Sequence, residues 1–457
     1  MKKLINIYTL FLLTVAIASG CKKSKDDNIN GIPTDQRLSA ALAKYKAKLL
    51  SGTDGWVLQV TPAGLKDQFG LSISPFSYYV LFTDSSACTQ LADWDTTSVK
   101  TPQQSTYSIR LYQRPTLSFD NYSYVAKASD PGDANGPVYA SEGGGYAWGS
   151  DFEFAFADNI DADKLGDTIN LKGIFNKSPA VLIKATKAQH DSAFAGAWAR
   201  SKSNFASINK ILTYWKRLTV NGITYEVILD EAGRTFTFKW FDDTLHTQAI
   251  PYLYNLDGSA SLVQAFTNGS TTITGFNNVS YDGTNANVTI GGINQATAIT
   301  PATSAIKLDS AAPKAWYNQM NINFNGKWAS DKAYHATGID DSCKITAIAS
   351  YQAYWYAGAG VFGTGSEGTC VLANNALVGT YSFSTTTFPA NTGRIRFMRK
   401  SISGTNAAIV AGATMLYGGT TNNSSFREWY LVPIDVEKNI YDMVRYPDAK
   451  AWIRWHP

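Results

Sequence analysis

The chain has 457 residues, of which 44% are hydrophobic and 17% are charged, and its formal net charge is +4. This length exceeds that of one typical domain, so two or three domains are expected, and the hydrophobic content excludes an intrinsically disordered chain. The near-neutral charge and the scarcity of basic runs argue against nucleic acid as a partner.

The N-terminus has the features of a bacterial lipoprotein signal peptide, in the usual order. Lys2 and Lys3 precede a mostly apolar run over residues 4–18, which is too short and too polar for a confident membrane span. The run leads into Ala18-Ser19-Gly20-Cys21, which resembles the lipobox, where small residues give the signal peptidase access to the bond before the cysteine. We therefore expect a signal peptide over 1–20 and a lipid on Cys21, with an ordinary signal peptide as the alternative.

Residues 21–35 are expected to tether the lipid to the folded chain. The stretch KKSKDDNINGIP is charged, is then punctuated by glycine and proline, and has little to bury. Lys25-Asp26-Asp27 resembles the acidic export signal that sends Bacteroidota lipoproteins to the outer face of the outer membrane. We therefore expect a lipid-anchored protein of the outer membrane on the cell surface, with a periplasm-facing anchor as the alternative.

Residues 36–190 are predicted to form an N-terminal α+β domain. Asp35 is expected to cap its first helix, and Gly52 to end it. The helix has apolar residues at the spacing of one face, namely Leu38, Ala41, Leu42, Tyr45 and Leu49. Strands rich in aromatic and β-branched residues are then expected at 56–61, 76–83, 106–112, 116–120, 151–156 and 168–174.

A middle β-rich region over 191–310 and a C-terminal β-rich domain over 311–457 are expected to follow. A second helical stretch is predicted over 188–216, and the alternating segments 218–229 and 234–240 predict a hairpin. An Asn/Gly/Thr/Ser-rich meander follows over 250–310, with later strands at 345–356, 369–372, 378–386, 393–400, 408–416 and 426–433. The sequence therefore predicts a mainly β chain with a short N-terminal helix, built from two or three antiparallel barrel or sandwich domains without an exact repeat.

Residues 36–190 resemble a known family. The matching series is a helix with Arg37 and Leu38, then Gly55-Trp56, YYVLF at 78–82, STY at 105–107, TLSFDNY at 116–122, SDP at 129–131, DFEF at 151–154 and DTINLKG at 167–173. This series resembles a Bacteroidota lipoprotein family called a domain of unknown function, whose genes often lie beside SusC/SusD-type uptake systems. The resemblance covers 36–190 and implies an accessory role in nutrient capture, without an established active site. The Gly-rich insertion GPVYASEGGGYAWGS before Asp151 departs from it.

The sequence offers little for catalysis. The four histidines, His190, His246, His335 and His456, are far apart in the sequence and form no metal-binding motif, and no GxSxG nucleophile motif occurs. Asp151 and Glu153 lie two residues apart on a predicted strand, so both would face one side of it. A glycosidase needs two opposed carboxylates, so this pair would serve only if another strand supplied the partner. Asp158, Asp161, Asp163 and Asp167 are interpreted as an acidic turn rather than a calcium loop.

Aromatic residues are the stronger signal, at 13% of the chain. Exposed rings serve as flat platforms for sugars in extracellular binding modules, although most rings in β proteins fill cores. The speculative ligand-binding residues are Tyr146, Trp148, Asp151, Glu153, Tyr354, Trp355 and Tyr356.

Three cysteines remain once Cys21 carries lipid. Cys343 and Cys370 are close enough in sequence to pair across neighbouring strands, and an envelope location permits that disulfide. Cys88 is predicted to be a buried thiol. Without a CxxC motif or a Cys/His cluster, no metal or other cofactor is expected.

We therefore expect a non-catalytic surface lipoprotein that binds an extracellular nutrient, with a glycan favoured, alongside a SusC/SusD-type transporter. The alternatives are a secreted degradative hydrolase without a recognisable motif, and a structural partner of an outer-membrane complex.

Overall fold

The computed structural model describes residues 32–63, 74–130, 149–156, 161–323, 327–330, 332–348, 352–356, 367–374, 376–404, 406–417 and 426–457. The predicted signal peptide, Cys21, most of the tether, Tyr146, Trp148 and Asp158 lie outside these residues. The chain divides into two compact units. The first comprises Met1–Leu71, Ser77–Ala92 and Thr101–His190, and the second comprises Ser72–Phe76, Asp93–Lys100 and Asp191–Pro457.

Helix α2, Thr34–Leu50, opens the described chain, but only its second half is buried. Tyr45 and Leu49 are the buried members of the predicted stripe, whereas Leu38 is 37% exposed. The predicted cap is wrong, because Pro33 holds the N-cap position and Asp35 lies in the first turn, where its charge favours the positive end of the helix dipole.

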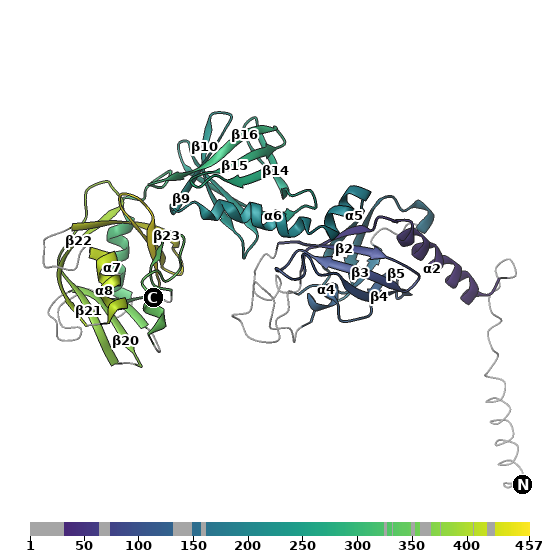
Figure 1. The fold of residues 1–457 in the computed structure, drawn as a ribbon, viewed down its shortest axis with the longest axis horizontal. Helices are drawn as coiled ribbons and strands as arrows, with labels where there is room; N and C mark the ends of the chain where they lie inside the picture. The colour runs from purple at the N-terminus through teal and green to yellow at the C-terminus, as the bar shows by residue number, and fades with distance from the viewer. Residues whose placement is uncertain are drawn as a thin grey trace, which may run out of the picture. The chain divides into compact units, whose positions relative to one another are not determined.

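Eight antiparallel strands form a closed barrel in the first unit (Figure 1). The strands are β1 Trp56–Val60, β2 Phe76–Phe82, β3 Ala87–Ala92, β4 Gln103–Leu111, β5 Pro115–Phe119, β6 Glu153–Phe156, β7 Thr168–Gly173 and β8 Pro179–Lys184. The ring closes because β1 pairs with β8, from Trp56↔Lys184 to Val60↔Ala180. Strands β3 and β8 were not predicted from the sequence. The short helices α4, Tyr124–Lys127, and η1, Ala162–Lys164, lie between strands.

A second closed barrel lies in the second unit and follows three short helices. The helices are α5 Lys187–Phe194, α6 Ala197–Ala206 and η2 Ser207–Lys210, and the strands are β9 Trp215–Val220, β10 Ile223–Asp230, β11 Thr235–Phe241, β12 Leu245–Tyr254, β13 Ala260–Asn268, β14 Thr271–Tyr281, β15 Ala286–Gly291 and β16 Gln295–Ala302. Phe205 of α6 packs against the rings of Phe236, Tyr252 and Phe276, so α6 contributes an aromatic side chain to the barrel core.

Two predictions for this region need correction. The helical stretch 188–216 is broken at Gly196, whose φ of +73° is left-handed, and Trp215 already belongs to β9. The predicted strand 218–229 is two strands, because Asn221 and Gly222 adopt φ values of +50° and +79° and turn the chain as an Asn-Gly hairpin. The predicted hairpin that follows is present, with β10 and β11 paired from Glu226↔Lys239 to Asp230↔Thr235.

The C-terminal part is a nine-stranded sheet of order β17-β19-β20-β21-β22-β23-β24-β25-β18. Its strands are β17 Lys327–Ser330, β18 His335–Ala336, β19 Gln352–Tyr356, β20 Glu367–Ala373, β21 Ala376–Thr387, β22 Arg394–Ser403, β23 Phe426–Asp435, β24 Ile440–Arg445 and β25 Ala451–Trp455. A bridge between Ala329 and His456 brings β17 back to the end of β25. Helices α7, Ala312–Asn323, and α8, Ala407–Tyr417, lie inside the curve of this sheet (Figure 1), and η3, Ile345–Ala347, precedes β19.

The segment predicted as a strand at 408–416 is instead helix α8, and the described part of 345–356 begins with η3 and ends with β19. The buried residues of α8 recur at helical spacing, as Ile409, Gly412, Ala413 and Leu416. Trp429 Nε1 donates to Leu416 O at 3.0 Å, which satisfies a carbonyl of the last helical turn. An apolar run of this length is compatible with either a buried strand or a buried helix. Here it forms a helix that packs inside a curved sheet.

One arrangement recurs in all three parts of the chain. Each first strand carries a buried tryptophan after a helix, namely Trp56 in β1, Trp215 in β9 and Trp328 in β17. Trp56 Nε1 donates to Leu49 O of α2 at 2.8 Å, and Trp328 Nε1 donates to Trp316 O of α7 at 3.2 Å. The fold is therefore mainly β with an N-terminal helix, as predicted, and its two closed domains are barrels rather than sandwiches.

Candidate functional site

Asp151, one of the predicted ligand-binding acids, faces the protein backbone. It lies two residues before β6 and is buried. Its Oδ1 accepts the backbone N–H groups of Phe175 and Asn176 at 2.7 and 2.8 Å, and its Oδ2 accepts that of Ser178 at 3.1 Å. These bonds occupy the carboxylate, so Asp151 holds the 174–178 loop and does not present its charge to a ligand.

Glu153, the second predicted acid, lies on the outer face of the first barrel. Glu153 is the first residue of β6. Phe154 and Phe156 lie on the opposite face of this strand and point into the core. Its Oε1 accepts the hydroxyl of Tyr112 at 2.8 Å and that of Ser118 at 3.1 Å. Because β6 begins at Glu153, the strand alternation that was predicted to place both acids on one face does not extend back to Asp151. The two carboxylates therefore lie in different environments.

Neighbouring strands bring a second carboxylate to Glu153. Ser108 of β4, Ser118 of β5 and Glu153 form one row across three strands. Asp120 follows β5, and its Oδ1 lies 3.2 Å from Ser118 Oγ. We call Arg110, Tyr112, Ser118, Asp120 and Glu153 the outer-face cluster. Asp120 is therefore the second carboxylate that the sequence analysis left open for Glu153. Because Asp120 lies two residues after Ser118, strand alternation would have placed both on the same face of the sheet.

Arg110 balances the two acids of the outer-face cluster. Its Nη2 donates to Asp120 Oδ1 at 2.7 Å and its Nε to Ser108 Oγ at 2.9 Å. The hydrogen bond with Tyr112 raises the pKa of Arg110, and the charges of Asp120 and Glu153 raise it further. The side chain of Arg110 is 49% exposed and Tyr112 is 48% exposed. The cluster therefore presents a cation, two anions and an aromatic ring to solvent.

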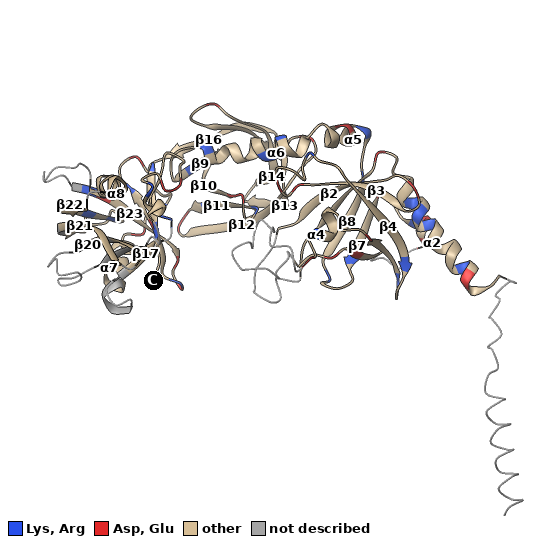
Figure 2. Cartoon of the chain, turned by 60° about the horizontal axis from the view of Figure 1, so that its bottom comes forward, with Lys and Arg blue, Asp and Glu red and all other residues tan. Residues whose placement is uncertain are grey.

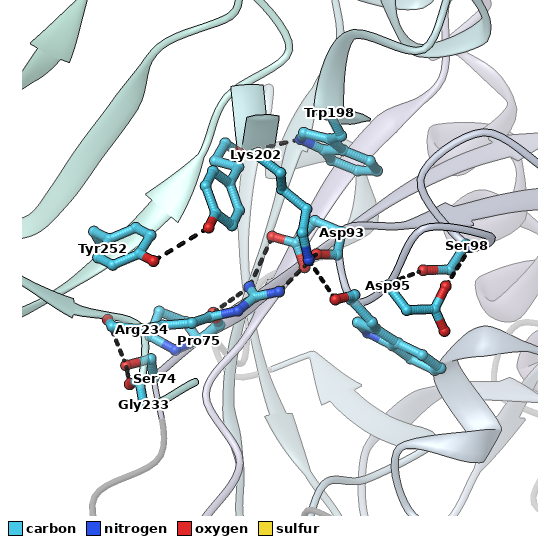
Figure 3. Close-up of polar contacts among 12 residues, drawn as sticks. Ser74, Pro75, Asp93, Asp95, Ser98, Trp198, Lys202, Gly233, Arg234 and Tyr252 are labelled. Carbon is cyan, nitrogen blue, oxygen red and sulfur yellow. Dashed lines mark hydrogen bonds and ion pairs between the residues drawn. The ribbon is translucent and has the colours of Figure 1, made fainter. Parts of the chain in front are cut away.

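A second polar cluster lies in the second unit and is built around a buried ion pair (Figure 3). Arg234 Nη1 donates to Asp93 Oδ2 at 3.0 Å, its Nη2 donates to Asp93 O at 2.6 Å, and both side chains are buried. The guanidinium lies 4.3 Å from the ring centre of Phe76 and 5.4 Å from that of Tyr254. Its donors and its flat faces are thus directed at the protein, which indicates a structural ion pair.

Lys202 completes this buried cluster. Its ammonium donates to the carbonyls of Asp93 and Trp94. Burial lowers the pKa of Lys202, and the nearby positive charge of Arg234 adds to that effect. Both cations therefore bind the segment Asp93–Lys100 to the helix and hairpin of the second barrel. Sequence reasoning missed this cluster because its members come from three distant segments.

The other predicted aromatic candidates are placed only in part. Tyr354, Trp355 and Tyr356 belong to β19, where Tyr354 is opposite Cys370 of β20 and Trp355 is opposite Trp328 of β17. These residues belong to a different unit from the outer-face cluster.

The disulfide prediction is not met in this structure. Cys343 is a buried free thiol, so the bridge to Cys370 is not formed. Cys88 is buried, as predicted, and burial raises its pKa to about 11, which disfavours the reactive thiolate.

The four histidines have separate surroundings. His190 Nδ1 lies 2.6 Å from Tyr79 Oη, His246 Nε2 lies 3.0 Å from Asp242 Oδ1, and His335 stacks on Trp452 with ring centres 3.8 Å apart. His456 Nδ1 lies 3.0 Å from Pro457 O. Among the described residues, no group of three or more His, Cys, Asp or Glu side chains is placed to hold a metal ion.

The acidic stretch before β7 pairs with the first helix. Asp163 accepts a hydrogen bond from Lys44 of α2, and Asp167 Oδ1 lies 3.4 Å from Lys48 Nζ. Figure 2 shows basic residues along α2. Asp161 precedes η1. Of the helices in the described ranges, none is long and apolar enough to cross a bilayer.

Similarity to solved structures is weak. The chain resembles isotype 1 transferrin binding protein B (TbpB) from serogroup B Neisseria meningitidis at 10% identity, over 88% of this chain and 74% of that one, with a TM-score of 0.17. It also resembles the structure of the C-terminal region of FEN-1 bound to A. fulgidus PCNA at 8% identity, over 56% of this chain and 93% of that one, with a TM-score of 0.10. Neither TM-score supports an argument about fold or activity.

No curated protein matches the chain. Residues 26–280, more than half of the chain, match the family model described as Domain of unknown function (DUF4302). This match covers the first barrel, with all of the outer-face cluster, and extends into β14 of the second barrel. The chain belongs to the DUF4302 family.

Proposed function

We propose that this protein is a lipid-anchored protein of the bacterial cell surface that binds an extracellular glycan through the outer-face cluster of its first barrel. The lipobox at Ala18 to Cys21 and the Lys25-Asp26-Asp27 stretch of the tether support the location. The resemblance described above supports Bacteroidota as the source and a SusC/SusD-type transporter as the partner. The observation that carries the binding function is the solvent-facing combination of Tyr112, Arg110 and two carboxylates.

These groups match the chemistry of a sugar. Hydroxyl groups of a sugar both donate and accept hydrogen bonds, so they pair with carboxylate oxygens and with guanidinium N–H groups. The apolar face of a pyranose ring packs on an aromatic ring such as Tyr112. Because Arg110, Asp120 and Glu153 already position one another, few side chains need to be ordered on binding.

Hydrolysis is the second candidate, because Asp120 and Glu153 both lie within hydrogen-bonding distance of the Ser118 hydroxyl. Retaining glycosidases use two carboxyl groups about 5–5.5 Å apart. Glycosidases, however, place their two carboxyl groups on either side of the reacting bond in a cleft, whereas this pair lies on the outside of a barrel with a half-exposed arginine beside it. Binding without catalysis fits that surface better.

Oligosaccharide binding to the exported chain from residue 22 tests the proposal. We expect Tyr112→Ala and Glu153→Gln each to weaken binding at least about tenfold, because each removes one direct contact worth about 1.4 kcal/mol. The matched controls lie on the second barrel. Phe241→Ala removes an exposed ring, Glu231→Gln removes a carboxylate bonded to Asn209, and both should leave the affinity unchanged.

Three results would contradict this function, and each points elsewhere. Sugar release that is lost in both Asp120→Asn and Glu153→Gln would identify a hydrolase. If Tyr112→Ala and Glu153→Gln bound the oligosaccharide as tightly as the two controls, the binding site would lie outside the outer-face cluster. An absence of binding to glycans and peptides, together with co-purification of a transporter, would favour a structural role.

Localisation has its own expected result. Cys21→Ser removes the lipid acceptor, so the protein should leave the membrane fraction or remain uncleaved. Replacing Asp26 and Asp27 by alanine should keep the lipid but reduce labelling of intact cells by a protease or a membrane-impermeant reagent. A Cys21→Ser protein that is still cleaved and still found in the membrane fraction would show that the lipobox interpretation is wrong.

A further inference from the structure

Phe175 is an unusually exposed ring on the first barrel. It lies in the 174–178 loop between β7 and β8, and 86% of its surface is accessible to solvent. Of the large hydrophobic side chains exposed in the described part of the chain, it is the most exposed. Single exposed apolar residues are common, so exposure alone does not mark a site.

The loop that carries Phe175 is held by a dedicated set of bonds. The buried Asp151 carboxylate accepts the N–H groups of Phe175 and Asn176 and also that of Ser178. Asn176 Nδ2 donates to Ser150 O at 2.6 Å. A Cβ at Gly173 would lie 2.1 Å from Asp151 Oδ2, so only glycine leaves room for this carboxylate. The exposed ring is therefore displayed on a preorganised backbone.

A second exposed ring lies at the same end of the β6–β7 ladder. The bond from Ile174 N to Glu153 O, 2.9 Å long, continues the ladder beyond Phe154↔Gly173. Phe152 precedes Glu153 and Phe175 follows Ile174, so the two residues leave the ladder at the same point. Phe152 is 42% exposed, and its carbonyl is fixed by Phe119 N at 3.1 Å. Phe152 is also the chain neighbour of Glu153, which belongs to the outer-face cluster.

The size of this surface indicates the ligand class. Two partly exposed phenylalanine rings offer at most a few hundred Å², below the roughly 800 Å² per partner that a stable protein interface buries. A single pyranose ring fits that area, and its apolar C–H face packs on an aromatic ring such as that of phenylalanine. Preorganisation lowers the entropy cost of binding, which matters most for a small contact.

We infer that Phe152 and Phe175 form a second sugar subsite, which stacks a further residue of the glycan held by the outer-face cluster. Asp151 is a positioning residue for this subsite, because it fixes the loop that carries Phe175. The inference rests on the proposed glycan binding and adds that the ligand is an oligosaccharide long enough to reach both places.

The test compares an oligosaccharide that binds with its own monosaccharide, on the exported chain from residue 22. Wild type should bind the oligosaccharide more tightly. Phe175→Ala and Phe152→Ala should each weaken oligosaccharide binding about tenfold and leave monosaccharide binding unchanged, and Phe175→Trp should retain affinity. The control Phe241→Ala should change neither.

The positioning role of Asp151 needs a measurement that a general loss of stability would not change. Asp151→Asn should weaken oligosaccharide binding, and the double variant Asp151→Asn/Phe175→Ala should bind no more weakly than Phe175→Ala alone, because both act through one ring. Additive losses would overturn the positioning role. Oligosaccharide affinity unchanged in both phenylalanine variants, but reduced in Glu153→Gln, would overturn the subsite and leave the proposed function intact. Failure of every glycan to bind wild type would overturn both.

Discussion

Replacing Asp93 by asparagine is expected to lower the free energy of unfolding of the second unit by about 3–5 kcal/mol, the usual cost of leaving one member of a buried ion pair without its partner. Asparagine keeps the shape of the side chain but removes the charge, so the Arg234 guanidinium stays buried without a counter-ion. The neighbouring rings of Phe76 and Tyr254 cannot replace it, because a cation–π contact is weaker than a buried charge pair.

Hydrogen exchange measured by mass spectrometry checks this result, because peptides over Asp93–Lys100 report the opening of that segment separately from the rest of a multi-part chain. The matched control is Lys44→Met, which breaks the exposed pair with Asp163 and should leave protection unchanged. The double variant Asp93→Leu/Arg234→Met removes both buried charges and should regain at least half of the loss. Unchanged protection in Asp93→Asn would mean that the pair does not hold this segment.

The second large effect is expected at Asp442, in the joint between the second barrel and the C-terminal sheet. This carboxylate is fully buried. It accepts hydrogen bonds from Arg454 Nε and Nη2, both at 2.8 Å, and from the Tyr214 hydroxyl at 2.7 Å. Burial and the Asp442 charge raise the pKa of Tyr214 well above its ordinary value, so the phenol remains a donor. Asp442→Ala should destabilise this joint by about 2–3 kcal/mol, because charge-assisted hydrogen bonds are lost while the buried phenol stays behind.

Chemical denaturation followed by tryptophan fluorescence is a suitable measurement, since Trp215 and Trp452 both contact the ring of Tyr214. Asp448→Ala is the matched control, because Asp448 pairs with Arg445 on the same hairpin but is more exposed, and it should cost less. Tyr214→Phe removes only the hydroxyl and should fall between them. Equal midpoints for Asp442→Ala and Asp448→Ala would contradict the role of Asp442 in the joint.

Local patterns were sufficient to predict much of the fold. Alternation and turn residues identified the β10–β11 hairpin, and the many short strands identified an antiparallel β chain. Strand β3, ACTQLA, was missed because its mix of small and polar residues has no clear period, although its residues are almost all buried. Helix α8 was taken for a strand because its apolar run shows no polar face to reveal the helical period.

The sequence singled out only part of the outer-face cluster. Glu153 was named with Asp151 as a speculative ligand-binding acid, whereas Arg110, Tyr112 and Asp120 join Glu153 only through the register of β4, β5 and β6. Asp151 was chosen for its charge, and its burial beneath the 174–178 loop depends on backbone geometry that a single sequence does not display. Long-range pairing, not residue type, separates a structural acid from one that faces solvent.

Both barrels close by pairing their first strand with their last, and this sets the order in which the chain can complete its fold. The chain is synthesised from its N-terminus, so β1 must wait for β8, and β9 must wait for β16, more than 75 residues later in each case. Until then, the N–H and C=O groups along one edge of β1 or β9 have only water to bind. Contacts so distant in sequence form slowly. Each barrel that has not yet closed is therefore an aggregation-prone intermediate until its eighth strand pairs with its first.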